Sequence, residues 1–186
     1  SCSFDVTGVL SVKTDANGIA SIETNPKNLA ALEVKPRYVS MRMGADNPSH
    51  LVLPIKIHVP VILTSEKGET MKGSAQILMN PSKPYGFQGD FGTYSGIYYD
   101  LAEAEASVPE QYVTQGFTKS YIDWENFKLQ LDVKNINVAT GQPEAGTCYF
   151  DSIALGSGRY PFKYDQGTSM AAPAATGVLS ILAGRY

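Results

Sequence analysis

The sequence predicts a mainly β protein, an antiparallel β-sandwich followed by one C-terminal helix. Its 186 residues include 11 Tyr, 7 Phe, 17 Gly and 11 Pro, a composition typical of strands separated by turns. Several segments alternate apolar and polar residues, as half-buried strands do. Only the C-terminal stretch combines small and apolar residues in the manner of a buried helix. We therefore expect a sandwich domain over residues 1–155 and a short, separate segment over residues 156–186.

The N-terminal part predicts a β-hairpin and then a longer strand. Residues 9–14 and 19–23 alternate on the two sides of an Asn17-Gly18 turn, which is the strongest short-range hairpin signal. The next strand is predicted within residues 32–43, where apolar residues alternate with others after position 37.

The middle of the chain predicts two more strands and little helix. The β-branched run over residues 51–63 contains Pro54 and Pro60, which favours an edge strand or a bent one. Residues 73–79 predict a returning strand, and residues 101–107 offer a short helix. The aromatic residues between 80 and 96 stand in a loop-like stretch, where they cap the end of a core or stack on sugar rings.

Two late segments predict the last strands of the sandwich. Residues 122–133 and 147–155 alternate well and flank a Gly- and Pro-containing turn. The Trp124-x-x-Phe127 pair followed by the strand from Tyr149 to Leu155 resembles the final strands of galactose-binding-like jelly rolls. That resemblance implies a jelly-roll-like topology, with carbohydrate as one ligand class.

The C-terminal segment carries the strongest chemical signal. Ser169 precedes a small-residue helical stretch, so its hydroxyl would lie at a helix N-terminus, where free N–H groups support developing negative charge. The segment from Gly167 to Pro173 resembles the nucleophile motif Gly-Thr-Ser-Met-Ala-x-Pro of subtilisin-like serine peptidases at every defined position. The resemblance implies that Ser169 is the nucleophile and that Gly167, Thr168 and Pro173 support the motif and its oxyanion site.

The remainder of a peptidase site is not identifiable in the sequence. A serine needs a base and a group that orients that base. The two histidines, His50 and His58, stand outside any His-Gly-Thr segment, and His58 lies in an apolar strand, which favours a packed or rim position. Asp5 begins a segment, Asp5-Val6-Thr7-Gly8, that is only loosely similar to the family's Asp-Thr-Gly, and no Ser-Ala-Gly-Asn stretch occurs. The chain carries the serine without its partners.

Three interpretations follow. The chain is a portion of an exported subtilisin-like endopeptidase, inactive in isolation, whose sandwich binds carbohydrate, positions a protein substrate or acts as a spacer. It is a degenerate relative that retains only the helix. Or the motif is accidental, and the protein is a non-enzymatic β-sandwich such as a carbohydrate-binding module or an assembly subunit of a capsid or surface filament. The first is the leading hypothesis, with an extracellular or cell-surface location and a peptide or protein substrate.

Composition and charge exclude several other classes. The net charge is −3, with 15 basic and 18 acidic residues spread along the chain, so we expect no nucleic-acid partner. No apolar run is long enough to span a bilayer, and no metal-ligand cluster or cofactor motif is evident. The two cysteines, Cys2 and Cys148, form one disulfide or remain free thiols.

Overall fold

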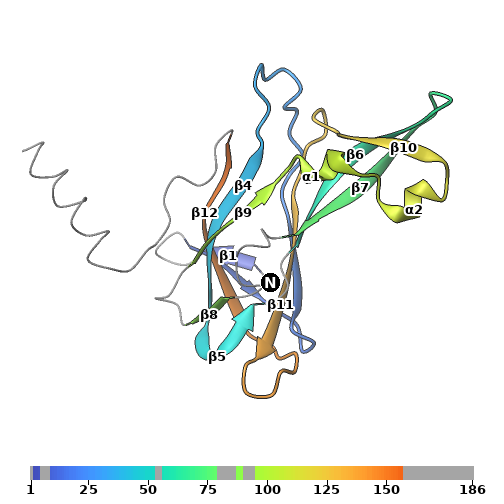
Figure 1. The fold of residues 1–186 in the computed structure, drawn as a ribbon. Coiled ribbons are helices and arrows are strands. Elements are labelled where there is room, and N and C mark those ends of the chain that lie inside the picture. Colours follow the sequence, from blue (N-terminus) through green and yellow to red (C-terminus); the bar gives the residue numbers. More distant parts are fainter. Residues whose placement is uncertain (1, 5–8, 53–55, 79–86, 90–94, 157–186) are drawn as a thin grey trace, which may run out of the picture.

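A computed structural model describes residues 2–4, 9–52, 56–78, 87–89 and 95–156 of the chain (Figure 1). Within these ranges the protein consists of antiparallel strands in two sheets together with two single-turn helices. This arrangement confirms the mainly β, antiparallel fold class, while the jelly-roll topology stays a prediction. The predicted C-terminal helix falls within residues 157–186, which lie outside the described residues.

The smaller sheet contains five strands, and every neighbouring pair is antiparallel. Its strand order from edge to edge is β1 (Cys2–Phe4), β2 (Leu10–Lys13), β12 (Thr147–Gly156), β4 (Tyr38–Ala45) and β9 (Ser95–Asp100). The last described strand, β12, therefore lies in the middle of this sheet and pairs with strands from the beginning of the chain.

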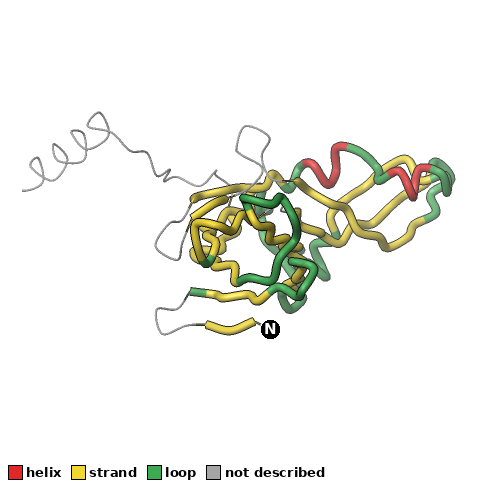
Figure 2. Tube along the Cα trace, turned by 90° about the horizontal axis from the view of Figure 1, so that it is seen from below, coloured by secondary structure: helices red, strands yellow, loops and turns green. Residues whose placement is uncertain are grey.

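The larger sheet contains seven strands. Its main path runs through β10 (Phe117–Ile122), β6 (Lys56–Ser65), β11 (Gln130–Asn137), β5 (Asn47–Val52) and β8 (Phe87–Gly89). Two further strands join it, β3 (Ile19–Glu23) beside β11 and β7 (Thr70–Leu78) beside β6. The helices α1 (Glu103–Ala106) and α2 (Glu110–Val113) accompany β7 and β10 at one end, which extends away from the rest of the sandwich (Figures 1 and 2).

The hydrophobic core lies between the two sheets. Strand β6 shows why: its alternate residues Ile57, Val59, Val61 and Leu63 are at most 1% exposed, so one face of the strand is fully buried. The five-stranded sheet contributes a matching set of buried side chains, comprising Val39, Met41 and Met43 of β4, Tyr99 of β9 and Phe150 of β12. Burial of these faces drives the sheets together.

The predicted hairpin over residues 9–23 is wrong, although its turn is present. The Asp15 N–H donates to the Ile19 carbonyl oxygen at 2.9 Å, and Gly18 has a φ of 69°. However, β2 pairs with β1 and β12, whereas β3 pairs with β11 in the other sheet. The two arms separate because each of them pairs with a strand from the last third of the described chain. The local turn signal determines the reversal of the chain but not the strand partners.

The edge-strand interpretation of the proline-rich run is wrong for β6, which has neighbours on both sides. Pro60 lacks an N–H, and it lies opposite Ser74 of β7. The Ser74 N–H donates to the Tyr112 hydroxyl at 3.1 Å. The Pro60 carbonyl oxygen, on the other side of β6, accepts the Asp123 N–H at 2.9 Å. The N–H and C=O of a strand residue point to the same side, so the missing N–H of Pro60 also faces Asp123, just beyond the end of β10 at Ile122. An internal strand therefore tolerates this proline, because no ladder bond is lost there.

Two smaller expectations compare simply with the structure. The short helix predicted within residues 101–107 is confirmed as α1, and the strand predicted within residues 32–43 begins only at Tyr38. Across the described ranges, none of the helices is both long enough and apolar enough to traverse a bilayer.

Candidate functional site

The predicted serine site lies outside the described residues. Ser169, Gly167, Thr168 and Pro173 belong to residues 157–186, and Asp5 falls within residues 5–8, which are also outside. Of the residues considered for peptidase chemistry, the structure therefore describes only the two histidines. In the structure each histidine contacts one or two carboxylates, and no pattern in the sequence connects these residues.

His58 is oriented by a carboxylate on the neighbouring strand. Its Nε2 lies 2.5 Å from Oδ2 of Asp132, and the two side chains are 18% and 29% exposed. The pairing of β6 with β11 sets His58 opposite Gln130, which places Asp132 on the same face, two residues along. Asp132 also accepts hydrogen bonds from the Ser21 hydroxyl at 3.2 Å and from Gln130 Nε2 at 3.1 Å. The result is a four-residue polar cluster on the outer face of the larger sheet.

The hydrogen bonds at Asp132 determine its charge state. Burial is the largest single effect on this carboxyl group and opposes ionisation, but the hydrogen bonds from His58, Gln130 and Ser21 together outweigh it. The pKa of Asp132 is therefore lowered, and the ionised carboxylate holds the His58 ring in a fixed orientation.

A carboxylate orients His58, as it would orient a general base, but no described serine is hydrogen-bonded to the ring. His58 lines a cavity of about 290 Å³ together with Ser74, Gln76, Glu103 and Gln111. Within the described ranges no hydrogen bond joins the His58 ring to a serine hydroxyl.

His50 lies between two carboxylates at the opposite end of the sandwich. Its Nδ1 is 2.5 Å from Oδ1 of Asp46, its Nε2 is 3.0 Å from Oε2 of Glu144, and its side chain is only 9% exposed. The Asp46 Oδ2 atom accepts the Thr147 N–H at 3.1 Å. Both ring nitrogens of His50 thus face carboxylate oxygens. His50 therefore connects the β4–β5 corner to the loop before β12, and neither nitrogen is available to a serine.

Two neighbours fix the geometry around His50. Asn137 Nδ2 donates to Oε2 of Glu144 at 2.9 Å, and this bond, followed by the one from His50, lowers the pKa of Glu144. Gly146 packs so closely that a Cβ atom there would lie 2.8 Å from His50 Nδ1. No pattern in the sequence indicates this cluster, because Glu144 stands 94 residues from His50.

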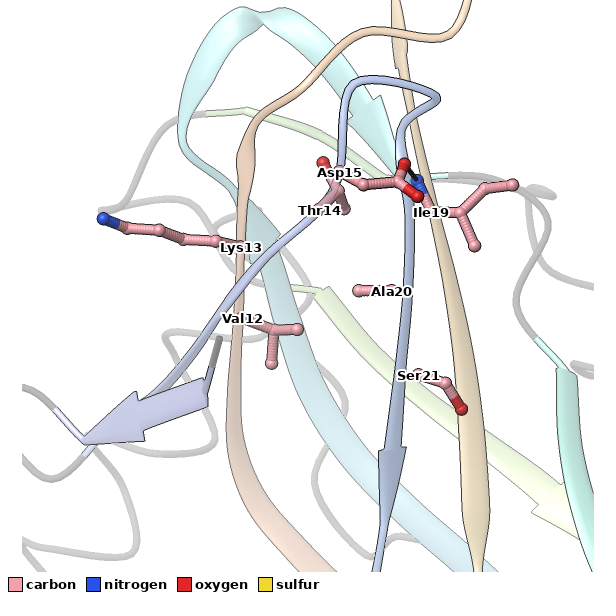
Figure 3. Close-up of a pocket in the computed structure, with 7 residues that line it drawn as sticks. All are labelled: Val12, Lys13, Thr14, Asp15, Ile19, Ala20 and Ser21. Carbon is pink, nitrogen blue, oxygen red and sulfur yellow. Dashed lines mark hydrogen bonds between the residues drawn. The ribbon is translucent and has the colours of Figure 1, made fainter.

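The cavity beside the first turn is lined by seven residues of β2, the turn and β3. It measures about 500 Å³ and lies between β2 and β3, where the arms diverge toward different sheets (Figure 3). The Asp15 carboxylate already accepts the N–H groups of Asn17 and Ile19, at 2.8 and 2.9 Å. Lys13 extends away from Ala20 and Ile19 (Figure 3). The polar side chains of this cavity do not converge on a common point, so it offers little for specific recognition.

The loop that follows β10 lines a third cavity. It measures about 320 Å³, and Trp124 contributes an aromatic wall. The other lining residues are Ile62 of β6, Lys72 of β7, and Ile122, Asp123, Glu125 and Asn126 around the loop. In the sequence, Trp124 stands out only as part of a strand pattern. The polar residues next to it in the sequence, Asp123, Glu125 and Asn126, could have suggested that this tryptophan lies at a surface site.

The two cysteines are not positioned to form a disulfide. Cys2 of β1 and Cys148 of β12 are both aligned with Val12 of β2, which lies between them. Their Cα atoms are thus two strand spacings apart, about 10 Å, whereas a disulfide requires about 7 Å or less. Cys148 is a free, fully buried thiol, and burial, with a smaller effect of Asp46, raises its pKa to about 12.

Comparison with known proteins gives little for this chain. No protein-family model matches it, and no curated protein matches it. Among solved structures, a protein provisionally described as a glycoside hydrolase, from Bacteroides thetaiotaomicron VPI-5482, is 11% identical over 87% of this chain and 55% of its own, with a TM-score of 0.33. A structure of infectious bursal disease virus, Gx strain, is 10% identical over 94% and 46%, with a TM-score of 0.12. The chain spans about half the length of each, and TM-scores this low support no argument about fold or function.

Proposed function

We propose that this chain is a portion of an exported subtilisin-like serine endopeptidase in which Ser169 is the attacking nucleophile. The observation that supports the proposal is the Gly167–Pro173 segment, which matches the nucleophile motif at every defined position. On this proposal the Ser169 hydroxyl attacks the carbonyl carbon of a peptide bond, and its own backbone N–H is one donor to the resulting oxyanion.

The base that activates Ser169 would belong to a part of the enzyme outside these 186 residues. In the described part, both nitrogens of His50 contact carboxylates, and Nε2 of His58 contacts Asp132. No hydrogen bond joins either ring to a described serine hydroxyl. We therefore assign the catalytic histidine, its aspartate and the oxyanion-hole asparagine to other parts of the same enzyme, and we expect residues 1–186 alone to hydrolyse peptides poorly or not at all.

In this proposal the sandwich is an insert that precedes the serine motif. Strand β12 ends at Gly156 and the motif begins at Gly167, so a short connection separates the two. The insert would then position a protein substrate, bind a ligand of its own or act as a spacer at the cell surface or outside the cell.

A fluorophosphonate probe that labels activated serines tests the proposal. We expect the complete encoded polypeptide to be labelled at Ser169, as read by mass spectrometry, and Ser169→Ala to abolish both labelling and peptide cleavage. Residues 1–186 alone should remain unlabelled because they lack the base. Ser180→Ala, in the same predicted helix, is the matched control and should leave labelling unchanged.

Two results would contradict this proposal. A complete polypeptide that cleaves peptides equally well with Ser169→Ala, or that is never labelled, would remove the peptidase assignment. Labelling of Ser169 in the isolated chain would show that the base lies within residues 1–186.

A further inference from the structure

The loop after β10 is held in place from three directions. The Asp123 N–H donates to the Pro60 carbonyl oxygen at 2.9 Å, and the Trp124 carbonyl oxygen accepts the Leu29 N–H at 2.7 Å. Phe127 and Lys27 exchange two backbone hydrogen bonds, at 3.0 and 2.9 Å. A loop anchored in this way presents its side chains without a large ordering cost on binding.

The Trp124 side chain is a fixed aromatic surface. It stacks on Phe127, with ring centroids 5.1 Å apart and planes at 20°, and Phe127 is only 3% exposed. Stacking covers one face of the indole, while Trp124 remains partly exposed and lines the cavity. Its indole N–H makes no hydrogen bond to any described residue. A rigid aromatic ring with an unused donor is a common element of small-molecule sites.

Hydrogen-bond donors and acceptors, some of them charged, surround the Trp124 ring. Lys72 and Glu125 are exposed and form no ion pair with each other or with another described residue. The Asp123 carboxylate, in a residue that is 7% exposed, accepts the backbone N–H of Asn126 at 3.2 Å and its side-chain amide at 3.4 Å. This contact orients Asn126 and leaves its amide oxygen as an acceptor. The cavity thus offers an ammonium donor and carboxylate and amide acceptors beside an apolar ring.

We propose that Trp124, Lys72, Glu125 and Asn126 form a binding site for a neutral saccharide, with a sugar ring packed against the indole. A pyranose has an apolar C–H face that suits an aromatic ring, and its hydroxyls both donate and accept hydrogen bonds. The volume of about 320 Å³ lies within the range of small-ligand sites. The site does not involve Ser169 and goes beyond the proposed peptidase function.

The charges of the cavity disfavour other ligands. An anion would meet the carboxylates of Asp123 and Glu125, which outnumber the single ammonium of Lys72. An apolar side chain would bury these polar groups without hydrogen bonds. On the same face of the sheet, Tyr121 lies directly opposite Ile62 and is 51% exposed, so a second aromatic surface adjoins the cavity and suits a disaccharide.

Trp124 is the only tryptophan in the chain, so its indole N–H resonance reports on this site alone. We would titrate the intact chain with methyl glucoside, methyl galactoside, methyl mannoside, lactose and cellobiose and follow that resonance by NMR. At least one of these sugars should give a saturable shift with a Kd of about 1 mM.

Glu125→Gln should weaken binding about tenfold by replacing a charged acceptor with a neutral one. Glu66→Gln, an exposed acid in the turn between β6 and β7, is the matched control and should leave the Kd unchanged.

The opposite outcomes overturn the inference. They are the absence of a saturable shift with all five sugars, an equal shift with glycerol at the same concentration, or a Kd insensitive to both Glu125→Gln and Lys72→Ala. Unchanged unfolding curves for these surface variants would show that a loss of binding is not a loss of folding. Ser169→Ala should bind the sugar normally, so failure of this inference is separable from failure of the peptidase proposal.

Discussion

Glu144 is held in its ionised form by two side chains from different parts of the fold. Hydrogen bonds from Asn137 and then His50 lower its pKa below the usual 4.5. A carboxylate with a lower pKa in the folded than in the unfolded chain stabilises the fold at pH values above the unfolded pKa. That contribution is lost as the pH falls through the folded-state value. Asp132 follows the same rule, because its pKa is also lowered.

We therefore expect the protein to lose stability on acidification below about pH 4.5, and Glu144→Gln to show a smaller loss. The measurement is the urea midpoint of unfolding at about pH 7 and at about pH 3.5. At pH 7 the variant should be the less stable protein, since the His50 contact is weakened. Glu66→Gln serves as the control with an exposed acid. An acid loss in Glu144→Gln as large as that of the unmodified chain would mean that this cluster does not contribute.

Gly18 is required by its backbone angle and also by its surroundings. Its φ is 69°, and a Cβ atom there would lie 2.2 Å from the Asn135 carbonyl oxygen. Gly141 has nearly the same φ, 67°, but nothing within 4 Å of its Cβ position. Alanine at Gly141 would therefore cost only the strain of a left-handed backbone, whereas alanine at Gly18 would add a steric clash.

Gly141→Ala should lower the free energy of unfolding by about 1 kcal/mol, from backbone strain alone. Gly18→Ala should lower it by about 3 kcal/mol or more, because β3 must also move away from β11. Urea unfolding of the two variants beside the unmodified protein measures both values. Equal losses would show that the close approach of the turn to Asn135 is not important.

The register of the five-stranded sheet determines the state of the cysteines. Because β2 lies between β1 and β12, Cys2 and Cys148 are separated by a full strand. We expect no disulfide between them, even in an oxidising medium. Burial keeps the Cys148 thiol protonated and covered.

Thiol labelling checks this with Cys2→Ser, in which Cys148 is the only thiol. The native protein should resist a maleimide reagent, and the same protein in guanidinium chloride should react fully, as read by intact mass. Rapid labelling of the native variant would contradict the burial of Cys148. A mass two daltons lower in the unmodified protein, restored by reductant, would contradict the strand register.

Over the whole molecule, local patterns predicted the fold class and the strands better than their partners. The β-branched run over residues 51–63 predicts a strand, and the structure has β6 within it with alternating burial, because strand propensity is a local property. The sheet to which each strand belongs is not a local property. Strands β2 and β3 flank one turn yet enter different sheets, and Pro60 is tolerated inside a sheet because its missing N–H faces Asp123, beyond the end of β10.

The candidate sites divide in the same way. Ser169 is identified from a contiguous motif, whereas the partners of the histidines could not be. Asp132 and Glu144 stand 74 and 94 residues from His58 and His50. Strand pairing brings Asp132 to His58, and the loop before β12 brings Glu144 to His50. Likewise, the Trp124 cavity combines a loop with residues from two earlier strands, a grouping that no periodicity in the sequence indicates.

The central place of β12 in the five-stranded sheet has a consequence for biosynthesis. Strands β2 and β4 both hydrogen-bond to β12, yet they leave the ribosome more than a hundred residues before it. Until β12 emerges, the strand edges that pair with it have no partner and the apolar faces of β2 and β4 remain exposed to solvent. Nascent chains in this state are prone to misfolding and aggregation. Closure of such distant pairs is also slow. Chaperones that shield exposed strands during translation should therefore matter more for the yield of this protein than for its final stability.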